Sequence, residues 1–256
     1  MSTLHVVRKG HIGDVIITEP VVRVLKRQFN RALLYTHYIE AGRLLEIYDD
    51  VLPYDLKPAE VTRPGDAIFN PLYEVFPGAN HLDGYARAAG VTLEDRLPRV
   101  KSGWPRIGSG RYGLIAPETS NWMRDMRQWP LERFTELKSR LQAALGFAFV
   151  LLGPSHSFCD MLSLIEHCDL FVGNDSAPAI LAQSWRRPAF VICGSTRAMR
   201  VLLDPSAVGI EHEVGCNGCK DFARHTDIGC ASPICLTELT VDKVHAVIME
   251  KFRAIG

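Results

Sequence analysis

Apolar and polar residues follow one another along the chain in two alternating patterns. Short apolar runs are typical of the buried strands of a parallel sheet, and longer stretches with apolar residues every three or four positions are typical of helices packed by one face. In the first half the pattern predicts strands at 4–7, 33–38, 50–54 and 66–69 and helices at 15–29, 41–48 and 81–90, the last with a stop at Gly90.

The second half repeats this order. We expect strands at 112–116, 147–152, 170–172 and 189–193 and helices at 131–145, 159–166, 177–182 and 239–252. Residues 97–110 are rich in Gly, Pro and Ser and are typical of a linker. Alternating strands and helices predict parallel sheets with helices on both faces. The expected architecture is therefore an α/β protein of two doubly wound units, 1–105 and 106–256.

Composition narrows the function classes. Of the 256 residues, 47% are hydrophobic and 23% are charged, which excludes a disordered chain. Basic and acidic residues number 29 each, so no overall field would draw the protein to nucleic acid or a membrane. The first apolar run is too short for a signal peptide, and no run approaches the ~20 residues that cross a bilayer. We expect a cytoplasmic protein with at most peripheral contact at the inner face of the inner membrane.

Residues 167–181, HCDLFVGNDSAPAIL, combine an apolar run with a tight turn and the start of a helix. Asn174, Asp175 and Ser176 lie at the turn, where free backbone N–H groups and the positive end of the helix dipole favour an anion such as a diphosphate. The alternative is that the three residues only cap the helix. Both interpretations stay open at this point.

Asp14 follows the first strand in a GxxGD pattern, where Gly10 and Gly13 allow a tight turn. It lies at or just before the start of the next helix and could be a cap. A carboxylate at the carboxyl edge of a strand could instead act as a general base. The helix dipole would keep this group ionised and make it a weaker base.

The loop PETSNWMRDMRQWP after 112–116 carries hydroxyls and cations suited to phosphate oxygens. We expect Trp122 and Trp129 to anchor this loop rather than stack on a base. A third strand, 189–193, also ends in small residues. The candidate phosphate-binding residues of the second half are Thr119, Ser120, Arg124, Arg127, Gly194, Ser195 and Thr196.

Four of the seven cysteines form a C-x2-C-x10-C-x4-C segment at 216–235. Cys216, Cys219, Cys230 and Cys235 could share one tetrahedral thiolate site, which favours Zn²⁺ or an iron centre, with His225 and Asp227 as substitute ligands. Free thiols or a disulfide are the alternatives. The other three cysteines stand in apolar surroundings and are expected in the core.

The order and spacing of GDVIITEPVVRVLKRQF, QWPLERFTEL, DLFVGNDSAPAILA and GST resemble glycosyltransferase family 9, the ADP-heptose:lipopolysaccharide heptosyltransferases. The resemblance implies a GT-B fold, in which two Rossmann-like domains face each other across a cleft. It also implies an inverting transfer of a heptose from ADP-heptose to a hydroxyl acceptor, in lipopolysaccharide core or another cell-surface glycan, with no metal in the chemistry.

The resemblance also implies roles for single residues. Asp14 matches the proposed catalytic base, and Arg127 stands where the family has a Lys or Arg that contacts the diphosphate. Thr119 and Ser120 resemble the hydroxyl pair of the same loop, and 174–176 match the GND[ST] element beside the donor. The chain departs from the pattern by being shorter, above all after Leu152, where Ser155 or His156 stand nearest to a ribose-binding Glu. Ala177 also replaces a Gly, and Ile180 replaces a His.

Two alternatives accompany this interpretation. The acceptor could be a protein hydroxyl, as in the autotransporter-modifying branch of the family, which binds iron through a cysteine cluster. The chain could also be a non-catalytic relative that binds a nucleotide and a metal. Replacing Asp14 by Asn distinguishes an enzyme from a non-catalytic relative. An enzyme should lose turnover while still binding nucleotide, whereas a binding protein has no turnover to lose.

Overall fold

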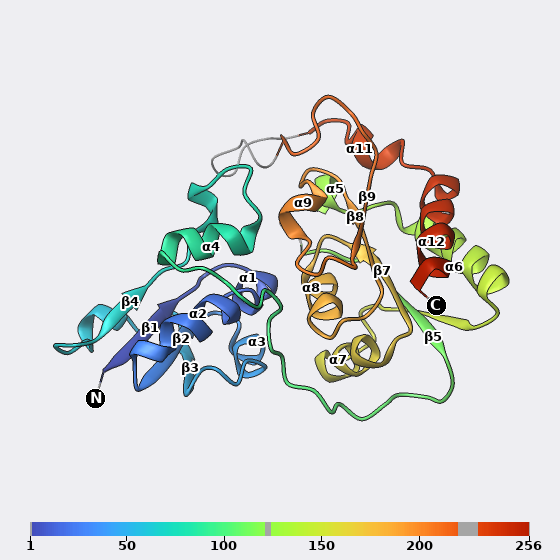
Figure 1. Ribbon diagram of the computed structural model, residues 1–256. Coiled ribbons are helices and arrows are strands. Elements are labelled where there is room, and N and C mark those ends of the chain that lie inside the picture. The colour runs from blue at the N-terminus through green and yellow to red at the C-terminus, as the bar shows by residue number, and fades with distance from the viewer. Residues whose placement is uncertain (1, 121–123, 220–229, 256) are drawn as a thin grey trace. The chain divides into compact units, whose positions relative to one another are not determined.

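The computed structural model describes residues 2–120, 124–219 and 230–255. The chain divides into two compact units, Met1–Ser102 and Gly103–Gly256, and each is built on one sheet (Figure 1). Every strand pair in both sheets is parallel. The predicted α/β class with two doubly wound sheets is confirmed. No helix among the described residues is both long enough and apolar enough to cross a bilayer.

The first unit has a four-stranded sheet in the order β3-β2-β1-β4. This is the order of one half of a dinucleotide-binding fold. Strands β2 and β3 are added on one side of β1 and β4 on the other, so the strand order reverses between β1 and β4. Its elements are β1 (Thr3–Val7), α1 (Ile12–Ile16), α2 (Glu19–Leu25), η1 (Lys26–Gln28), β2 (Arg31–Thr36), α3 (Ile39–Arg43), β3 (Asp50–Pro53), η2 (Pro58–Glu60), β4 (Ala67–Phe69), η3 (Tyr73–Val75) and α4 (His81–Ala89).

The prediction of a single helix over 15–29 is wrong. The segment forms α1, a break at Ile17 and Thr18, and then α2. Pro20 explains the break, because it has no N–H to donate to the carbonyl four residues earlier and is tolerated only in the first turn of a new helix. The first helix also starts earlier than predicted, because α1 begins at Ile12 and Asp14 is its third residue.

Other bounds in this unit differ by a few residues. The helix expected over 41–48 is the shorter α3, whereas α4 starts where the pattern placed it. Gly90 ends α4 at φ 64°, in the left-handed region that favours glycine, so the predicted stop is confirmed. No helix or strand occupies 97–110 in the described chain, as expected for a linker.

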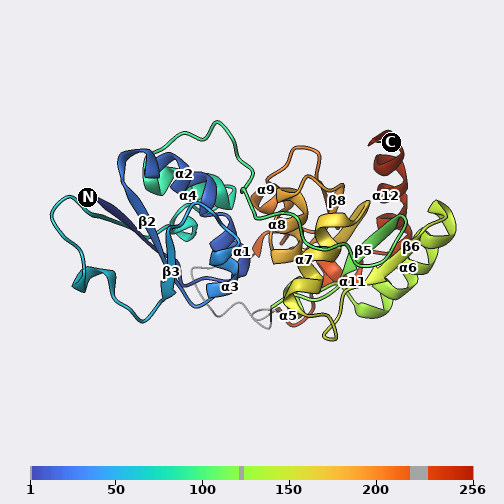
Figure 2. The same cartoon turned by 90° about the horizontal axis from the view of Figure 1, so that it is seen from below.

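The second unit has a five-stranded sheet in the order β6-β5-β7-β8-β9, with its reversal between β5 and β7. Helices α6 and α12 cover one face and α7 and α8 the other (Figures 1 and 2). The elements are β5 (Tyr112–Ala116), α5 (Arg124–Arg127), α6 (Leu131–Leu145), β6 (Ala148–Leu151), α7 (Phe158–His167), β7 (Leu170–Asn174), α8 (Ala177–Ser184), β8 (Ala189–Cys193), α9 (Ala198–Val201), β9 (Val208–Glu211), α11 (Ile234–Thr237) and α12 (Val241–Ile255).

Trp129 anchors the loop between β5 and α6, as predicted. Its ring is fully buried, packs edge-on against Phe134, and its indole N–H donates to the Leu239 carbonyl over 2.9 Å. Trp122 lies outside the described residues. The sequence pattern missed β9 and α11, since each is only four residues long and β9 has a single fully buried residue. These elements close the core that holds the β5, β7 and β8 carboxyl ends in place.

Candidate functional site

Each sheet has one point where its strand order reverses, and ligands of open α/β sheets bind at the carboxyl ends of the strands beside such points. In the first unit these ends belong to β1 and β4, and in the second to β5 and β7. Asp14 follows β1, whereas Arg127 and Asp175 follow β5 and β7. The candidate residues therefore lie at two edges, one in each unit.

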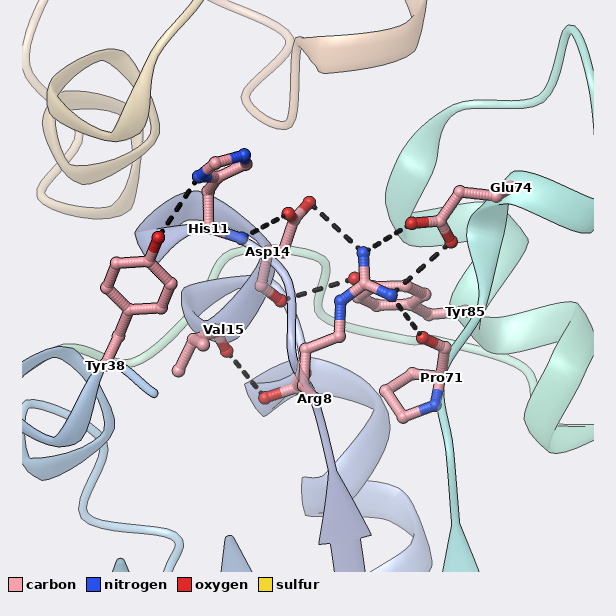
Figure 3. Close-up of polar contacts among 9 residues, drawn as sticks. Arg8, His11, Asp14, Val15, Tyr38, Pro71, Glu74 and Tyr85 are labelled. Carbon is pink, nitrogen blue, oxygen red and sulfur yellow. Dashed lines mark hydrogen bonds and ion pairs between the residues drawn. The ribbon is translucent and has the colours of Figure 1, made fainter. Parts of the chain in front are cut away.

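At the first edge the Asp14 carboxylate is held by its own loop. Its Oδ2 accepts the His11 N–H over 2.7 Å, as in a capping box, and the carboxylate is 15% exposed (Figure 3). Gly10 makes room for this arrangement, because a Cβ there would lie 2.4 Å from Oδ2. The second oxygen, Oδ1, lies 3.5 Å from Nη2 of Arg8. The capping role considered from the sequence is thus present, and the second carboxylate oxygen faces a cation.

Arg8 links Asp14 to the loop after β4. The residue is 3% exposed, and its Nη2 and Nη1 donate to Glu74 Oε1 over 2.7 Å and to the Pro71 carbonyl over 2.9 Å (Figure 3). Burial lowers the pKa of Arg8, but the charges of Asp14 and Glu74 and the nearby Tyr85 outweigh it and raise that pKa above its usual value. Arg8 is therefore a permanent cation.

Two tyrosines enclose this cation. The Arg8 guanidinium lies 5.2 Å from the ring centre of each of Tyr73 and Tyr85, within cation–π range. The Tyr85 hydroxyl donates to the Asp14 carbonyl over 3.4 Å. Burial, and after it the charge of Asp14, raises the pKa of both tyrosines well above the usual value, so both hydroxyls stay protonated.

At the second edge, Arg127 joins the loop after β5 to the turn after β7. Its Nη2 donates to the Asp175 carbonyl over 2.5 Å and lies 3.4 Å from the Asp175 carboxylate, while Nη1 donates to Ser120 Oγ over 3.5 Å. The Ser195 N–H after β8 donates to the Met126 carbonyl over 3.3 Å. The loops after three strands, β5, β7 and β8, thus meet at this edge.

Polar atoms at this edge lack partners. The hydroxyls of Ser195 and Thr196, each 1% exposed, and the Nε of Arg127 are buried with no hydrogen-bond partner among the described residues. A buried polar group without a partner costs about 1–3 kcal/mol, and such groups are rare in native folds. Two hydroxyls after β8 and a guanidinium N–H after β5, on loops joined by the hydrogen bond from Ser195 to Met126, are a donor set suited to the oxygens of an anion.

Other predicted site residues serve the fold of this edge. Asn174 is fully buried, and its amide bridges the Pro117 carbonyl at 2.6 Å and the Trp129 N–H at 3.0 Å. Ser176 is the N-cap residue of α8 but makes no side-chain cap; its hydroxyl donates to the Asn174 carbonyl over 3.2 Å.

Thr119 and Gly194 also serve packing and loop structure in the described chain. The Thr119 hydroxyl donates to the Ser120 carbonyl over 3.2 Å. A Cβ at Gly194 would meet Leu236 at 2.8 Å, so a glycine is needed there for close packing. Arg124 is exposed at the start of α5.

A pocket of ≈ 330 Å³ opens beside the second edge, at the carboxyl ends of β5 and β6. Leu152, Phe158, Met161 and Pro178 give it an apolar lining, and His156 supplies a polar ring. Its size is at the small end of ligand pockets, and apolar walls with few polar groups are their usual composition.

The four cysteines of 216–235 are free thiols in the structure. Among the described residues, no three His, Cys, Asp or Glu side chains are placed so that they could hold a metal ion. Burial, followed by the charges of Cys219, Cys216 and Cys230, raises the pKa of Cys235 to about 11, so the four sulfurs influence one another. The substitute ligands His225 and Asp227 lie outside the described residues.

Sequence reasoning missed Arg8, Tyr73, Glu74 and Tyr85. Arg8 carried a weak signal, since a charged residue directly after a buried strand stands at a sheet edge. The other three are at least 59 positions away from Asp14, and the β1–β4 pairing brings their loops together.

Residues 140–225 match the model of glycosyltransferase family 9 (heptosyltransferase). This segment runs from within α6 past β9 and includes the turn after β7 and the end of β8. No curated protein matches the sequence.

Solved structures share the fold over nearly the whole chain. The iron-containing dodecameric glycosyltransferase TibC from enterotoxigenic E. coli H10407 is similar at 17% identity, with a TM-score of 0.78 over 99% of this chain and 77% of that one. The ADP-heptose lps heptosyltransferase II of E. coli is 13% identical, with a TM-score of 0.70 over 99% of this chain and 98% of that one. E. coli heptosyltransferase WaaC with ADP is 14% identical, with a TM-score of 0.63 over 97% of this chain and 99% of that one. The resemblance of residues 140–225 to the family and the GT-B type of fold are confirmed.

Proposed function

We propose that this chain, with its family 9 segment and its heptosyltransferase fold, is an inverting glycosyltransferase that moves a heptose from ADP-heptose to a hydroxyl acceptor. The observation that carries the proposal is the unpartnered donor set at the second edge, formed by Ser195, Thr196 and Arg127. We take 1–105 as the acceptor-side domain and 106–256 as the donor-side domain.

The second edge suits a nucleoside diphosphate. Hydroxyls and a guanidinium N–H would bind the phosphate oxygens, and α8 begins at Ala177 with its N-terminal N–H groups beside them. The ≈ 330 Å³ apolar pocket next to Pro178, at the start of α8, would take the base. E. coli WaaC has been solved with ADP and TibC with ADP-D-beta-D-heptose, which supports an ADP-sugar as the donor.

Asp14 would act as the general base of the transfer. Its carboxylate takes the proton of the acceptor hydroxyl while that oxygen bonds to the anomeric carbon. The bond from this carbon to the β-phosphate oxygen breaks on the opposite face, which inverts the configuration. The electron pair leaves with ADP, whose developing charge Arg127 and the helix N-terminus stabilise. In this proposal Asp14 belongs to the first unit and the donor site to the second, so turnover requires residues of both units.

For the acceptor we propose a hydroxyl of lipopolysaccharide core or another cell-surface glycan, in keeping with the similarity to the E. coli lps heptosyltransferase II. The second candidate is a protein hydroxyl. It is favoured by the four-cysteine segment together with the similarity to TibC, which is described as iron-containing. Transfer from labelled donor to delipidated core oligosaccharide or to a Ser-rich polypeptide separates the two.

We further propose that Cys216, Cys219, Cys230 and Cys235 take up Zn²⁺ or iron in a structural role. Four thiols in the C-x2-C-x10-C-x4-C spacing of 216–235 are a donor set for these metals. Elemental analysis should find about one metal per chain, lost in a Cys216→Ser/Cys219→Ser variant and retained in Cys159→Ser, an exposed thiol elsewhere. A metal-free protein that folds normally would contradict this.

The test of the function is a panel of ADP-, GDP- and UDP-sugars, read by thermal shift and by donor turnover. We expect a stabilising shift with ADP-heptose, and turnover that requires an acceptor. A shift without turnover for any acceptor would favour the non-catalytic relative, and no shift with any donor would contradict the proposal.

A further inference from the structure

The first edge holds an ion-pair arrangement in which one buried cation serves two carboxylates. Arg8 lies between Asp14 on the β1 side and Glu74 on the β4 side (Figure 3). The two contacts are unequal. The separation from Glu74 is 2.7 Å, a normal charge-assisted hydrogen bond, whereas that from Asp14 is 3.5 Å.

The unequal distances matter for a base. A carboxylate that accepts two full hydrogen bonds from a guanidinium has its lone pairs occupied and its basicity reduced. Here Glu74 and the Pro71 carbonyl take the short hydrogen bonds of Arg8. The positive charge of Arg8 therefore attracts and orients the Asp14 carboxylate from 3.5 Å, without giving it a short hydrogen bond.

Packing fixes the cation in this position. The Tyr73 and Tyr85 rings lie on the guanidinium, and Tyr73 is stacked on His81 with ring centres 3.9 Å apart. The η3 turn that carries Tyr73 and Glu74 lies directly against α4, because a Cβ at Gly84 would come within 2.8 Å of the Tyr73 Cα. At 3% exposure Arg8 itself is shielded from a substrate, so any effect on the reaction must pass through Asp14.

We propose that Arg8 is a positioning residue for the Asp14 carboxylate and that Glu74 sets how far the guanidinium reaches toward it. This inference rests on the proposed function, in which Asp14 is the base. It predicts that changes at Arg8 and Glu74 alter kcat and leave the binding of ADP unchanged, because the ADP site is built by the second unit.

The experiment compares Arg8→Lys with Arg23→Lys in the full chain. Arg23 is a matched control, since it also lies in the first unit and joins two carboxylates, Glu19 at 3.2 Å and Asp95 at 2.6 Å. A lysine keeps the charge but cannot reach both acids with a planar fork. We expect kcat to fall about 10- to 100-fold in Arg8→Lys with the dissociation constant of ADP within two-fold of wild type. Equal kcat in the two variants would overturn the proposal.

Glu74 provides a second variant that is less demanding for folding, because its side chain is 32% exposed. We expect Glu74→Gln to lower kcat by about 3- to 10-fold, as the released guanidinium turns toward Asp14, and Glu74→Asp to restore part of the loss by keeping the charge. Glu60→Gln, on an exposed acid, is the control. No difference between Glu74→Gln and this control would also overturn the proposal.

Asp14→Asn in the same assay separates the two claims. If Asp14→Asn keeps full turnover, both the base and its positioning fail. If it loses turnover while the Arg8 and Glu74 variants match their controls, only the positioning fails.

Discussion

The two sheet edges differ in how their charged groups are satisfied. At the first edge, Asp14, Arg8 and Glu74 are paired with one another within one unit. At the second edge, Arg127 is paired with Asp175 on one side, but its Nε and the Ser195 and Thr196 hydroxyls find no partner among the described residues. The buried Nε of Arg8 at the first edge also lacks a partner among the described residues, so the two edges differ in the two unpartnered hydroxyls of the second edge.

This difference indicates that the two edges have separate roles, proton transfer at the first and anion binding at the second. A group that must take a proton needs a fixed position and a defined charge state, which internal ion pairs supply. A group that must bind an anion needs free donors held in place in advance, at some cost to stability. The predictions below test whether the edges are specialised in this way.

The largest effect is expected for Asp14→Asn. Removing the base should lower kcat by about 10²- to 10⁴-fold, because the amide cannot take the acceptor proton. Steady-state turnover of ADP-heptose measures this. Asp83→Asn, which breaks an ion pair with Arg96 in the same unit, should change kcat by less than about two-fold. Comparable losses in both variants would count against Asp14 as the base.

Arg127→Lys should weaken ADP binding by about 10-fold. Lysine keeps the charge but loses the planar donor fork that reaches both Asp175 and a phosphate oxygen. Calorimetric titration with ADP gives the dissociation constant. Arg140→Lys, at an exposed pair with Glu136 and Asp242, is the control and should bind ADP as wild type does. Unchanged affinity in Arg127→Lys would place the diphosphate elsewhere.

Ser195→Ala and Thr196→Val should separate binding from stability. Since neither hydroxyl has a partner in the described chain, we expect Tm to stay level or rise slightly while ADP affinity falls about 3- to 10-fold. Ser163→Ala is the control, because the Ser163 hydroxyl donates to the Pro105 carbonyl over 2.6 Å. This variant should lower Tm and leave ADP affinity unchanged. A large drop in Tm for the Ser195 variant would mean that its hydroxyl already has a structural partner.

The smallest effect concerns thiol chemistry. In protein freed of metal by a chelator, Cys235, with its pKa raised to about 11, is almost entirely protonated at pH 8, and its alkylation should accelerate as pH rises toward 11. Exposed Cys216 should react faster at pH 8. Mass spectrometry after brief iodoacetamide treatment measures both sites. Fast labelling of Cys235 at neutral pH would contradict the raised pKa.

Much of the fold was predictable from local pattern. The bounds of β5, α6 and β8 match the expected 112–116, 131–145 and 189–193, because strongly apolar strands and a long amphipathic helix dominate their local sequence. The split of the first helix at Pro20 was missed, since its apolar spacing continues across the break.

The site was predictable only in part, for a physical reason. Asp14, Arg127 and Asp175 stand beside glycine turns or strand ends, so position in sequence indicates position at an edge. Glu74 and Tyr73 act through contacts with Arg8 across 65 or so positions, and no local pattern encodes such pairs. The missing partners of Ser195 and Thr196 are likewise visible only once packing is known.

The most direct test of these separate roles is the dissociation constant of ADP, measured by calorimetry for wild type, Asp14→Asn and a Ser195→Ala/Thr196→Val double variant. We predict that Asp14→Asn binds ADP within two-fold of wild type although it has lost turnover, and that the double variant binds at least about ten-fold more weakly. Weaker binding in Asp14→Asn together with unchanged binding in the double variant would contradict the account.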